Sequence, residues 1–311
     1  MEKLVPKGNY GVVMTPFRED GTLDEKLLRQ EFLYCNTTNA AGLLLCGSTS
    51  EFIYLELDQA KRVYQLGKEC VSKEKVLIGG AGGANEHQVM ERLIYLADIG
   101  YTYAIICPPY YYPQKPDDIY DFYRNISARA PTGLKLMLYN IPFCSPGIPL
   151  SILPRLLELE NIVGMKDSSG DMLYFTKAVS MAQERRPEFA IFTGQDSTFL
   201  PSLTVGGHGC MSALVWMLDT DFSILRLFEE NEMKKAGEIQ MQLIRLVRLL
   251  DHISFPENYR ALSGVLGIPM GTPQRSFHGL QGEEYDRWEA AVRNTLRYIQ
   301  PKEIERRRSF V

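Results

Sequence analysis

One lysine of the chain stands where it could act as a nucleophile. Lys166 directly follows the apolar run NIVGM at 161–165, which would place its amine at the inner end of a buried segment. Burial favours the uncharged form of a lysine, and an uncharged amine condenses with carbonyl groups. An exposed or ion-paired lysine is the commoner interpretation, but the apolar run weakens it here. The sequence therefore favours Schiff-base chemistry.

Tyr139 is the candidate for the proton relay that a Schiff-base enzyme needs. It ends the apolar run that precedes the one before Lys166, so the two residues would be neighbours in a parallel sheet. A phenol there could move protons while a carbinolamine forms and a carbon–carbon bond breaks. Taken alone, Tyr139 would be a packed aromatic residue with a satisfied hydroxyl. Its place beside Lys166 favours the catalytic interpretation.

The segment GSTSE at 47–51 is a candidate site for the carboxylate of a 2-oxo acid. Ser48 and Thr49 offer hydroxyls and backbone amides directly before a helical pattern. The start of a helix is rich in hydrogen-bond donors, which suits an anion. Helix capping by serine or threonine is the alternative interpretation.

These residues follow short apolar runs that alternate with helical patterns. The predicted strands are 11–14, 42–46, 76–78, 104–107, 135–139, 162–165, 190–193 and 209–213. Apolar residues recur at helical spacing between them, as in 24–36, 57–70, 85–100 and 117–130. Eight such units predict an α/β fold, a (β/α)8 TIM barrel, with an open doubly wound sheet as the alternative. The glycine-rich segment 78–87 matches no nucleotide-binding fingerprint, and we interpret it as a tight turn.

The carboxyl ends of the strands form the functional face of such a barrel. Residues that close the predicted strands are therefore site candidates, and they include Tyr111, Ser168, Gly194 and Asp196 in addition to those above. We predict that Ser168 contacts the substrate.

The pattern changes to helices alone after about residue 230. Segments 232–252, 257–267 and 283–299 are helical by period. We therefore predict two parts, a catalytic barrel at 1–230 and a C-terminal helical region at 231–311.

Composition excludes several classes of function. The 311 residues carry a net charge of −4, which does not attract a nucleic-acid backbone. No apolar run approaches the roughly 20 residues of a membrane span, and no signal peptide is evident, so we expect a cytoplasmic protein. Six cysteines without paired spacing and four dispersed histidines indicate neither a disulfide framework nor a metal site. We expect no cofactor and no metal.

Several motifs together resemble the dihydrodipicolinate synthase and N-acetylneuraminate lyase family of pyruvate-type class I aldolases. The resemblance covers nearly the whole chain. It rests on GVVMTPF (11–17), GSTSE (47–51), CPPYYYP (107–113), LYNIP (138–142), GMKDSSGD (164–171), FTGQD (192–196), VGGHGCMSA (205–213) and LGIPMGTP (266–273).

The resemblance implies roles for individual residues. Lys166 would form the Schiff base, Tyr139 would be the acid and base, and Ser48 and Thr49 would bind the carboxylate of pyruvate. Tyr111 would enter the site of a neighbouring subunit, which requires a homodimer or, as is common in the family, a homotetramer. Gly194 and Asp196 would bind the distal part of the substrate.

Departures from the family pattern bear on the substrate. Cys144 stands where the synthase branch has an arginine, and Ser197 and Ala213 replace polar residues of the sialic acid branch. Both of those substrates are therefore disfavoured. The KDSSG segment resembles branches that act on 2-keto-3-deoxy acids or on 4-hydroxy-2-oxoglutarate. Ser50 replaces a glycine of the GSTSE segment, so we expect its side chain to narrow the pocket.

The leading hypothesis is a lyase that cleaves a hydroxylated 2-oxo acid to pyruvate and an aldehyde, or condenses them. Dehydration or a dihydrodipicolinate synthase-like condensation on the same imine is the runner-up. A noncatalytic barrel that binds 2-oxo acids is the alternative from a different class.

Overall fold

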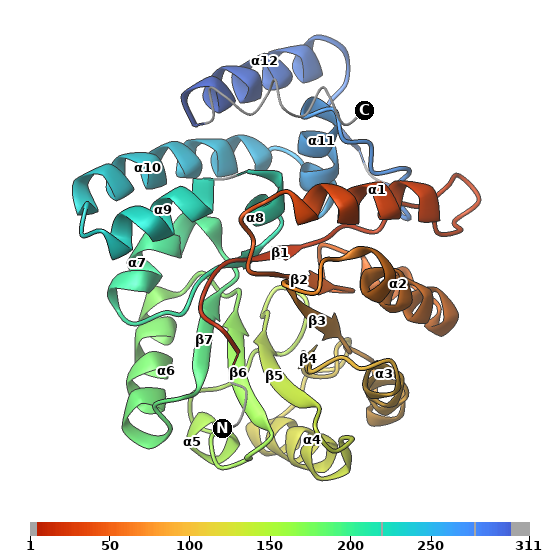
Figure 1. Cartoon of the computed structure of the whole chain (residues 1–311), viewed down its shortest axis with the longest axis vertical. Coiled ribbons are helices and arrows are strands. Elements are labelled where there is room, and N and C mark those ends of the chain that lie inside the picture. The colour runs from red at the N-terminus through yellow and green to blue at the C-terminus, as the bar shows by residue number, and fades with distance from the viewer. Residues whose placement is uncertain (1–4, 219, 277, 300–311) are drawn as a thin grey trace.

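The chain folds into a parallel barrel of strands surrounded by helices (Figure 1). The computed structural model describes residues 5–218, 220–276 and 278–299. Their eight strands are β1 (Tyr10–Val12), β2 (Gly42–Leu45), β3 (Val76–Gly80), β4 (Tyr103–Ile106), β5 (Lys135–Asn140), β6 (Ile162–Asp167), β7 (Ala190–Thr193) and β8 (Met211–Ser212). The order is β7-β6-β5-β4-β3-β2-β1-β8, and a parallel bridge from Thr193 to Cys210 nearly closes the ring. The predicted (β/α)8 barrel is confirmed, and the open sheet is wrong because that bridge joins the two ends of this order, β7 and the segment before β8.

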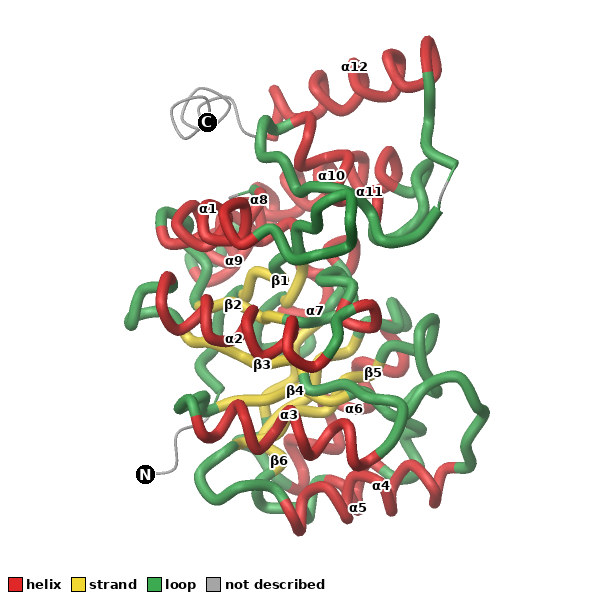
Figure 2. The backbone as a smooth tube through the Cα atoms, turned by 90° about the vertical axis from the view of Figure 1, so that its right-hand side faces the viewer, coloured by secondary structure: helices red, strands yellow, loops and turns green. Residues whose placement is uncertain are grey.

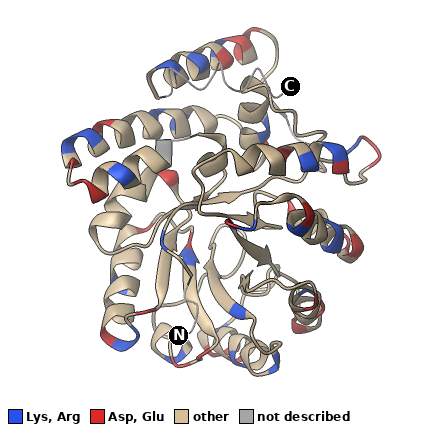
Figure 3. Cartoon of the chain, in the orientation of Figure 1, with Lys and Arg blue, Asp and Glu red and all other residues tan. Residues whose placement is uncertain are grey.

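Helices follow the strands and cover the outside of the barrel (Figure 2). They are α1 (Glu25–Asn36), η1 (Phe52–Tyr54), α2 (Leu57–Cys70), α3 (Glu86–Asp98), α4 (Pro116–Arg129), α5 (Leu153–Leu156), α6 (Met172–Arg185), η2 (Asp196–Thr198), α7 (Phe199–Thr204), α8 (Leu214–Met217), α9 (Thr220–Glu229), α10 (Met233–Leu250), α11 (Glu257–Val265) and α12 (Gly282–Ile299). Side chains of Asp24, Asn85 and Asp171 accept hydrogen bonds from the first amides of α1, α3 and α6. Charged residues lie mainly on the outer helices (Figure 3). None of the helices within the described ranges is long and apolar enough to cross a membrane.

Two strand boundaries differ from the prediction for identifiable reasons. Strand β1 ends at Val12 rather than residue 14, since the Met14 amide donates to the Glu31 carboxylate instead of continuing the ladder. Strand β8 begins at Met211 rather than residue 209. Gly209 has a φ of 150°, and its backbone lies so close to Gly8 that an added Cβ would collide with the Gly8 carbonyl oxygen.

The interior of the barrel is filled by side chains. These inward residues include Tyr10, Val12, Leu44, Ile78, Ile105, Met137, Phe192 and Met211. The rings of Tyr10 and Phe192 meet edge to face with centroids 5.5 Å apart. This packed floor leaves the carboxyl end of the strands as the place where a ligand can enter.

The described chain after residue 230 consists of helices α10, α11 and α12 and the loops that join them, and residues 300–311 of the predicted C-terminal region lie outside the described part. Helix α10 crosses the top of the barrel in Figure 1. Its Gln240 side chain accepts from Leu200 N at 2.8 Å and donates to the Asp196 carbonyl at 2.9 Å. Helix α12 is tied to α10 by a bond from Trp288 Nε1 to the Leu249 carbonyl at 2.8 Å. The C-terminal helices thus hold segments that follow β7.

Candidate active site

Strand pairing brings Lys166 and Tyr139 together at the carboxyl end of the barrel. Lys166 in β6 is the register partner of Tyr139 in β5, and both side chains are almost fully buried. Lys166 Nζ lies 4.6 Å from the centroid of the Tyr139 ring. Strand β6 extends to Asp167, two residues beyond its predicted end, so Lys166 is a strand residue. Backbone pairing therefore fixes the relative positions of amine and phenol.

The amine of Lys166 has no hydrogen-bond or ion-pair partner in the part of the chain that is described. Neither an ion pair nor a hydrogen bond joins Nζ to a described residue, although only 3% of the residue is exposed. The side chain passes Gly194, where an added Cβ would come within 2.7 Å of Lys166 Cε and would also collide with Ser168 Oγ. The glycine leaves room for the lysine to reach the cavity.

A turn after β2 presents donors opposite the lysine. Ser48 Oγ and Tyr139 Oη form a hydrogen bond of 2.8 Å. The amide of Ser50 donates to the carbonyl of Gly47, and the amide of Glu51 donates to the carbonyl of Ser48. Among the described residues, the amides of Ser48 and Thr49 and the Thr49 hydroxyl have no hydrogen-bond partner. Two amides and a hydroxyl are thus available to an anion.

The helix expected to follow this turn is not the donor. Only the three-residue η1 comes next, and α2 begins at Leu57 with a capping box from Glu56 and Gln59. Ser48 and Thr49 cap no helix, and the predicted carboxylate site does not lie at the start of a long helix. The available donors belong to the turn itself.

Ser50 does not narrow the cavity, which corrects the expectation from the sequence. Its side chain is fully buried, donates to the Val13 carbonyl at 2.5 Å and accepts from Gly47 N at 3.0 Å. It lines neither of the cavities described below. Ser50 instead fastens the turn to β1.

Glu51 ends the turn in a left-handed conformation and forms a buried ion pair. Its φ is 54°, and its carboxylate accepts from Arg260 Nη2 of α11. Burial raises the pKa of Glu51, whereas the Arg260 charge opposes that rise. Arg260 also donates to the Met270 carbonyl. The pair ties the turn to the C-terminal helices.

Three further hydrogen bonds join polar groups at the ends of strands β5 to β8. Asp196 accepts from Ser212 Oγ of β8, and Gln195 Nε2 donates to the Ser168 carbonyl at 3.0 Å. Asp167 accepts from Asn140 Nδ2 at 2.7 Å. Burial raises the pKa of Asp167, while hydrogen bonds from Ser169 and Asn140 lower it. These bonds hold the strand ends that carry the site.

One cavity of about 160 Å³ gathers most of the predicted site residues. Its lining includes Ser48, Thr49, Tyr139, Lys166, Ser168, Gly194 and Asp196. The sequence did not single out Phe143, Val247, Asp251, Asn258 and Tyr259, which also line it. Four of these follow residue 230, and no βα pattern placed them near the barrel.

Tyr111 lies outside this cavity. The side chain is 87% exposed, its φ is 86°, and its ring meets that of Tyr112 edge to face at 5.0 Å. A single copy of the chain therefore does not bring Tyr111 to Lys166.

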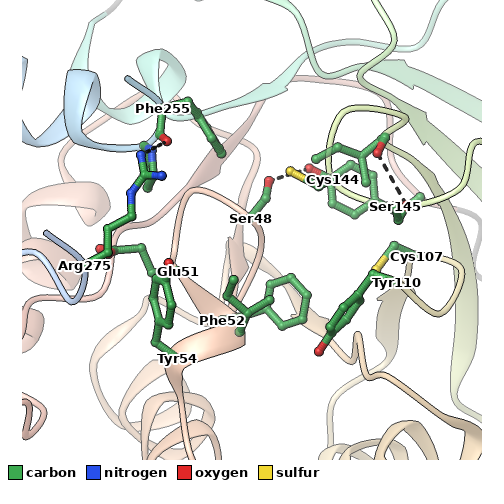
Figure 4. Close-up of a pocket in the computed structure, with 14 residues that line it drawn as sticks. Ser48, Glu51, Phe52, Tyr54, Cys107, Tyr110, Cys144, Ser145, Phe255 and Arg275 are labelled. Carbon is green, nitrogen blue, oxygen red and sulfur yellow. Dashed lines mark hydrogen bonds between the residues drawn. The ribbon is translucent and has the colours of Figure 1, made fainter. Parts of the chain in front are cut away.

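A second cavity of about 270 Å³ adjoins the first (Figure 4). Ser48, Tyr139 and Phe255 line both. We call this second cavity the outer chamber. Figure 4 shows Ser48, Cys144, Phe52, Tyr54 and Tyr110 among the residues around it.

Comparison with known proteins gives a consistent result. A model of the dihydrodipicolinate synthetase family matches residues 6–295. An uncharacterized DapA-like lyase of Thermococcus onnurineus is 29% identical over 290 residues, which are 92% of this chain and 97% of that protein.

Solved structures share the fold. Dihydrodipicolinate synthase DapA-2 from Bacillus anthracis has a TM-score of 0.87 at 24% identity, covering 94% of this chain and 99% of that one. The 2-keto-3-deoxygluconate aldolase from Picrophilus torridus has a TM-score of 0.81 at 26% identity, covering 89% of this chain and all (100%) of that one. A lyase that works through a Schiff base fits the family match and the cavity around Lys166. Because the family model spans almost the entire sequence, the chain belongs to the dihydrodipicolinate synthetase family.

Proposed function

We propose that the protein interconverts a 4-hydroxy-2-oxo acid with pyruvate and an aldehyde through an imine on Lys166. The observation that carries this proposal is a buried amine without a protein partner, 4.6 Å from the ring of a tyrosine whose hydroxyl bonds to Ser48. An amine in such a place is suited to attack a carbonyl. The name of the Picrophilus torridus aldolase supports a 2-oxo acid substrate.

In the first step the Lys166 amine adds to C2 of the 2-oxo acid, and water is lost from the carbinolamine. The protonated imine has a double bond between the lysine nitrogen and C2, and it can accept an electron pair. The Ser48 and Thr49 amides, with the Thr49 hydroxyl, hold the carboxylate. Tyr139 supplies and receives the protons of this step, and its bond to Ser48 keeps the hydroxyl in place.

In the second step Tyr139 takes the proton of the C4 hydroxyl. The bond between C3 and C4 breaks, its electron pair forms the enamine, and the aldehyde leaves. Protonation of C3 and addition of water then release pyruvate and the free lysine. Condensation runs through the same states in reverse, and Ser168, Gly194 and Asp196 contact the part of the substrate that lies in the cavity of Lys166.

We also propose that the protein is a cytoplasmic homodimer or homotetramer in which Tyr111 reaches the site of a neighbouring copy. The outward ring of Tyr111, held by a left-handed backbone, supports this arrangement. The proposed organisation is a barrel at 1–230 that carries the chemistry and a helical region at 231–311 that covers it. Native mass spectrometry would give dimers or tetramers, and a monomer alone would contradict the assembly.

Product analysis tests the reaction. The protein is incubated with a 4-hydroxy-2-oxo acid, and pyruvate and aldehyde are measured by mass spectrometry. Lys166→Ala should produce neither, whereas Lys177→Ala, at an exposed position of α6, should match the original chain. An oxo acid that has lost water but no carbon would instead indicate a dehydratase on the same imine. Turnover by Lys166→Ala would overturn the proposal.

A further inference from the structure

The outer chamber has no assigned role, although it opens from the catalytic tyrosine. Tyr139 and Ser48 line both this chamber and the cavity that holds Lys166. In the proposed reaction Tyr139 contacts the C4 hydroxyl, so a substituent on C4 starts at the wall shared by the two cavities. The chamber is thus continuous with the position of the aldehyde half.

Most side chains around the chamber are apolar or aromatic. Its lining includes Phe52, Ile53, Tyr54, Tyr110, Ile141 and Phe255. The rings of Phe52 and Tyr110 meet edge to face with centroids 6.0 Å apart. A cavity of roughly 150 Å³ with apolar walls already accommodates benzene, and this chamber has about 270 Å³. An aryl or branched alkyl group fits the space.

The charged groups of the chamber are already paired. Arg275 donates to both oxygens of the buried Glu257 carboxylate, at 2.9 and 2.7 Å, and to the Phe255 carbonyl at 2.6 Å. Glu51 is paired with Arg260, so it adds no unpaired charge to the lining. Cys144 adds no charge, since burial raises the pKa of its thiol above the usual value. A second carboxylate on the substrate would meet no unpaired cation among the described lining residues.

A chain of hydroxyl groups would fare no better than a carboxylate. Each hydroxyl moved from water into an apolar space loses hydrogen bonds unless a partner replaces them. Ser145 Oγ, one of the few polar groups of the lining, is directed to the carbonyls of Ile141 and Pro146. Sugar-like aldehydes therefore match this lining poorly.

We propose that the outer chamber binds an apolar substituent on the aldehyde half of the substrate, an aryl or branched alkyl group. This inference rests on the proposed function, since it assigns the group that leaves with C4. Carbon–carbon bond formation is unchanged: the enamine carbon attacks the aldehyde carbon, and the aldehyde oxygen takes a proton.

Aldehyde selectivity tests the proposal. The condensation of pyruvate is measured with benzaldehyde, 3-methylbutanal, glyceraldehyde and succinic semialdehyde. We expect kcat/KM for the first two aldehydes to exceed that for the last two by at least about tenfold. Equal or higher kcat/KM for glyceraldehyde or succinic semialdehyde would overturn the proposal.

A charge placed in the chamber gives the second arm. Cys144→Arg should lower kcat/KM for benzaldehyde by at least about tenfold and raise the relative rate with succinic semialdehyde, because an unpaired cation favours a carboxylate. Leu33→Arg, on the exposed face of α1 and outside both cavities, should leave the selectivity unchanged. The same aldehyde selectivity in both variants would contradict the assignment.

A binding measurement separates this inference from the proposed function. Binding of benzyl alcohol, followed by ligand-observed NMR, should be present in the original chain and weakened in Cys144→Arg. A pyruvate adduct on Lys166 without benzyl alcohol binding would overturn the chamber assignment and keep the lyase. Benzyl alcohol binding without any adduct on Lys166 would overturn the lyase and leave an apolar site without a reaction.

Discussion

Three side chains carry the proposed chemistry, and each is held by a different constraint. Lys166 is placed by its register with Tyr139, and Tyr139 is placed by strand β5 and by its bond to Ser48. Ser48 sits on a turn that Ser50 fastens to β1. The three side chains are therefore already in position before a substrate binds. Such preorganisation is the main contribution that a protein makes to this kind of catalysis.

Replacing Tyr139 by phenylalanine separates the ring from the hydroxyl. The ring beside Lys166 remains, but the proton relay and the bond to Ser48 are lost. We expect kcat to fall by about 10²- to 10⁴-fold, with the imine still trapped, only more slowly. Steady-state kinetics and borohydride trapping measure the two effects. Tyr112→Phe, at an exposed position, is the control, and full activity of Tyr139→Phe would remove the phenol from the mechanism.

The strands and their ends position the site at the level of elements. Tyr139 of β5 pairs with Lys166 of β6, and Lys166 pairs with Phe192 of β7, so these residues and the segment after Thr193 meet at one end of the barrel. Gly194 follows β7 and leaves the space that the Lys166 side chain occupies.

Gly194→Ala tests that space against a matched glycine. An added Cβ would collide with Ser168 Oγ and lie within 2.7 Å of Lys166 Cε, so the lysine must shift and kcat/KM should fall at least about tenfold. Gly237→Ala in α10 meets no atom within 4 Å and should keep activity while stabilising the fold by about 0.5–1 kcal/mol. Kinetics and thermal unfolding of both variants give the comparison. Equal kcat/KM in the two would show that the space is not needed.

Helix α1 is joined to the end of β1 by a buried carboxyl group. Glu31 accepts from Met14 N at 2.8 Å, and its other oxygen has no partner among the described residues. Burial, its largest influence, raises the pKa of Glu31 from 4.5 to about 8. The folded state therefore binds the Glu31 proton more tightly than the unfolded state does.

The sign of the pH effect follows from this difference. The stability that the protonated group contributes is complete below pH 4.5 and is lost as the pH rises towards about 8. Through this window the free energy of unfolding should fall with a slope of up to about 1.4 kcal/mol per pH unit. Glu31→Gln removes the titration and should flatten that part of the profile. Urea unfolding at a series of pH values measures it, and identical slopes in both proteins would refute the assignment.

Much of the barrel and of the candidate site was predictable from the sequence. Apolar runs indicate where the strands lie, and the ends of the strands indicate where the site lies. The runs before Lys166 and after Lys135 placed amine and phenol side by side. Contacts made by loops, and by helices that are far away in the sequence, leave no such pattern of apolar residues. Gln240 reaches the Asp196 carbonyl from 44 positions away, and the Ser50 hydroxyl turns away from the cavity. Packing of the C-terminal helices, not local pattern, decides these contacts.

At the scale of the whole molecule, the shape of the cavity of Lys166 depends on how the C-terminal helices are attached to the barrel. Helix α10 contributes Val247 and Leu250 to the lining of the cavity of Lys166. Asp251, which lies directly after this helix, also lines the cavity. Helix α11 holds the turn of the carboxylate site through Arg260 and Glu51. The cavity of Lys166 is therefore built jointly by the barrel and these helices.

Breaking the Glu51 and Arg260 pair should destabilise the protein strongly. Arg260→Ala leaves the Glu51 carboxylate buried without its partner, which costs about 3–5 kcal/mol. The exposed pair of Arg293 and Glu289 on α12 is the contrast, since Arg293→Ala should cost less than about 1 kcal/mol. Chemical denaturation of both variants measures the free energy of unfolding. A small loss in Arg260→Ala would mean that the pair does not hold the turn.

The central claim is that Lys166 forms an imine with a 2-oxo acid, and covalent trapping tests it most directly. The protein is incubated with pyruvate and sodium borohydride, its intact mass is measured, and the modified peptide is mapped. We predict one reduced pyruvyl adduct per chain, located on Lys166 and absent from Lys166→Ala, with Lys177→Ala modified as the original. No adduct under conditions that trap another aldolase of the family, or an adduct on a different lysine, would contradict the account.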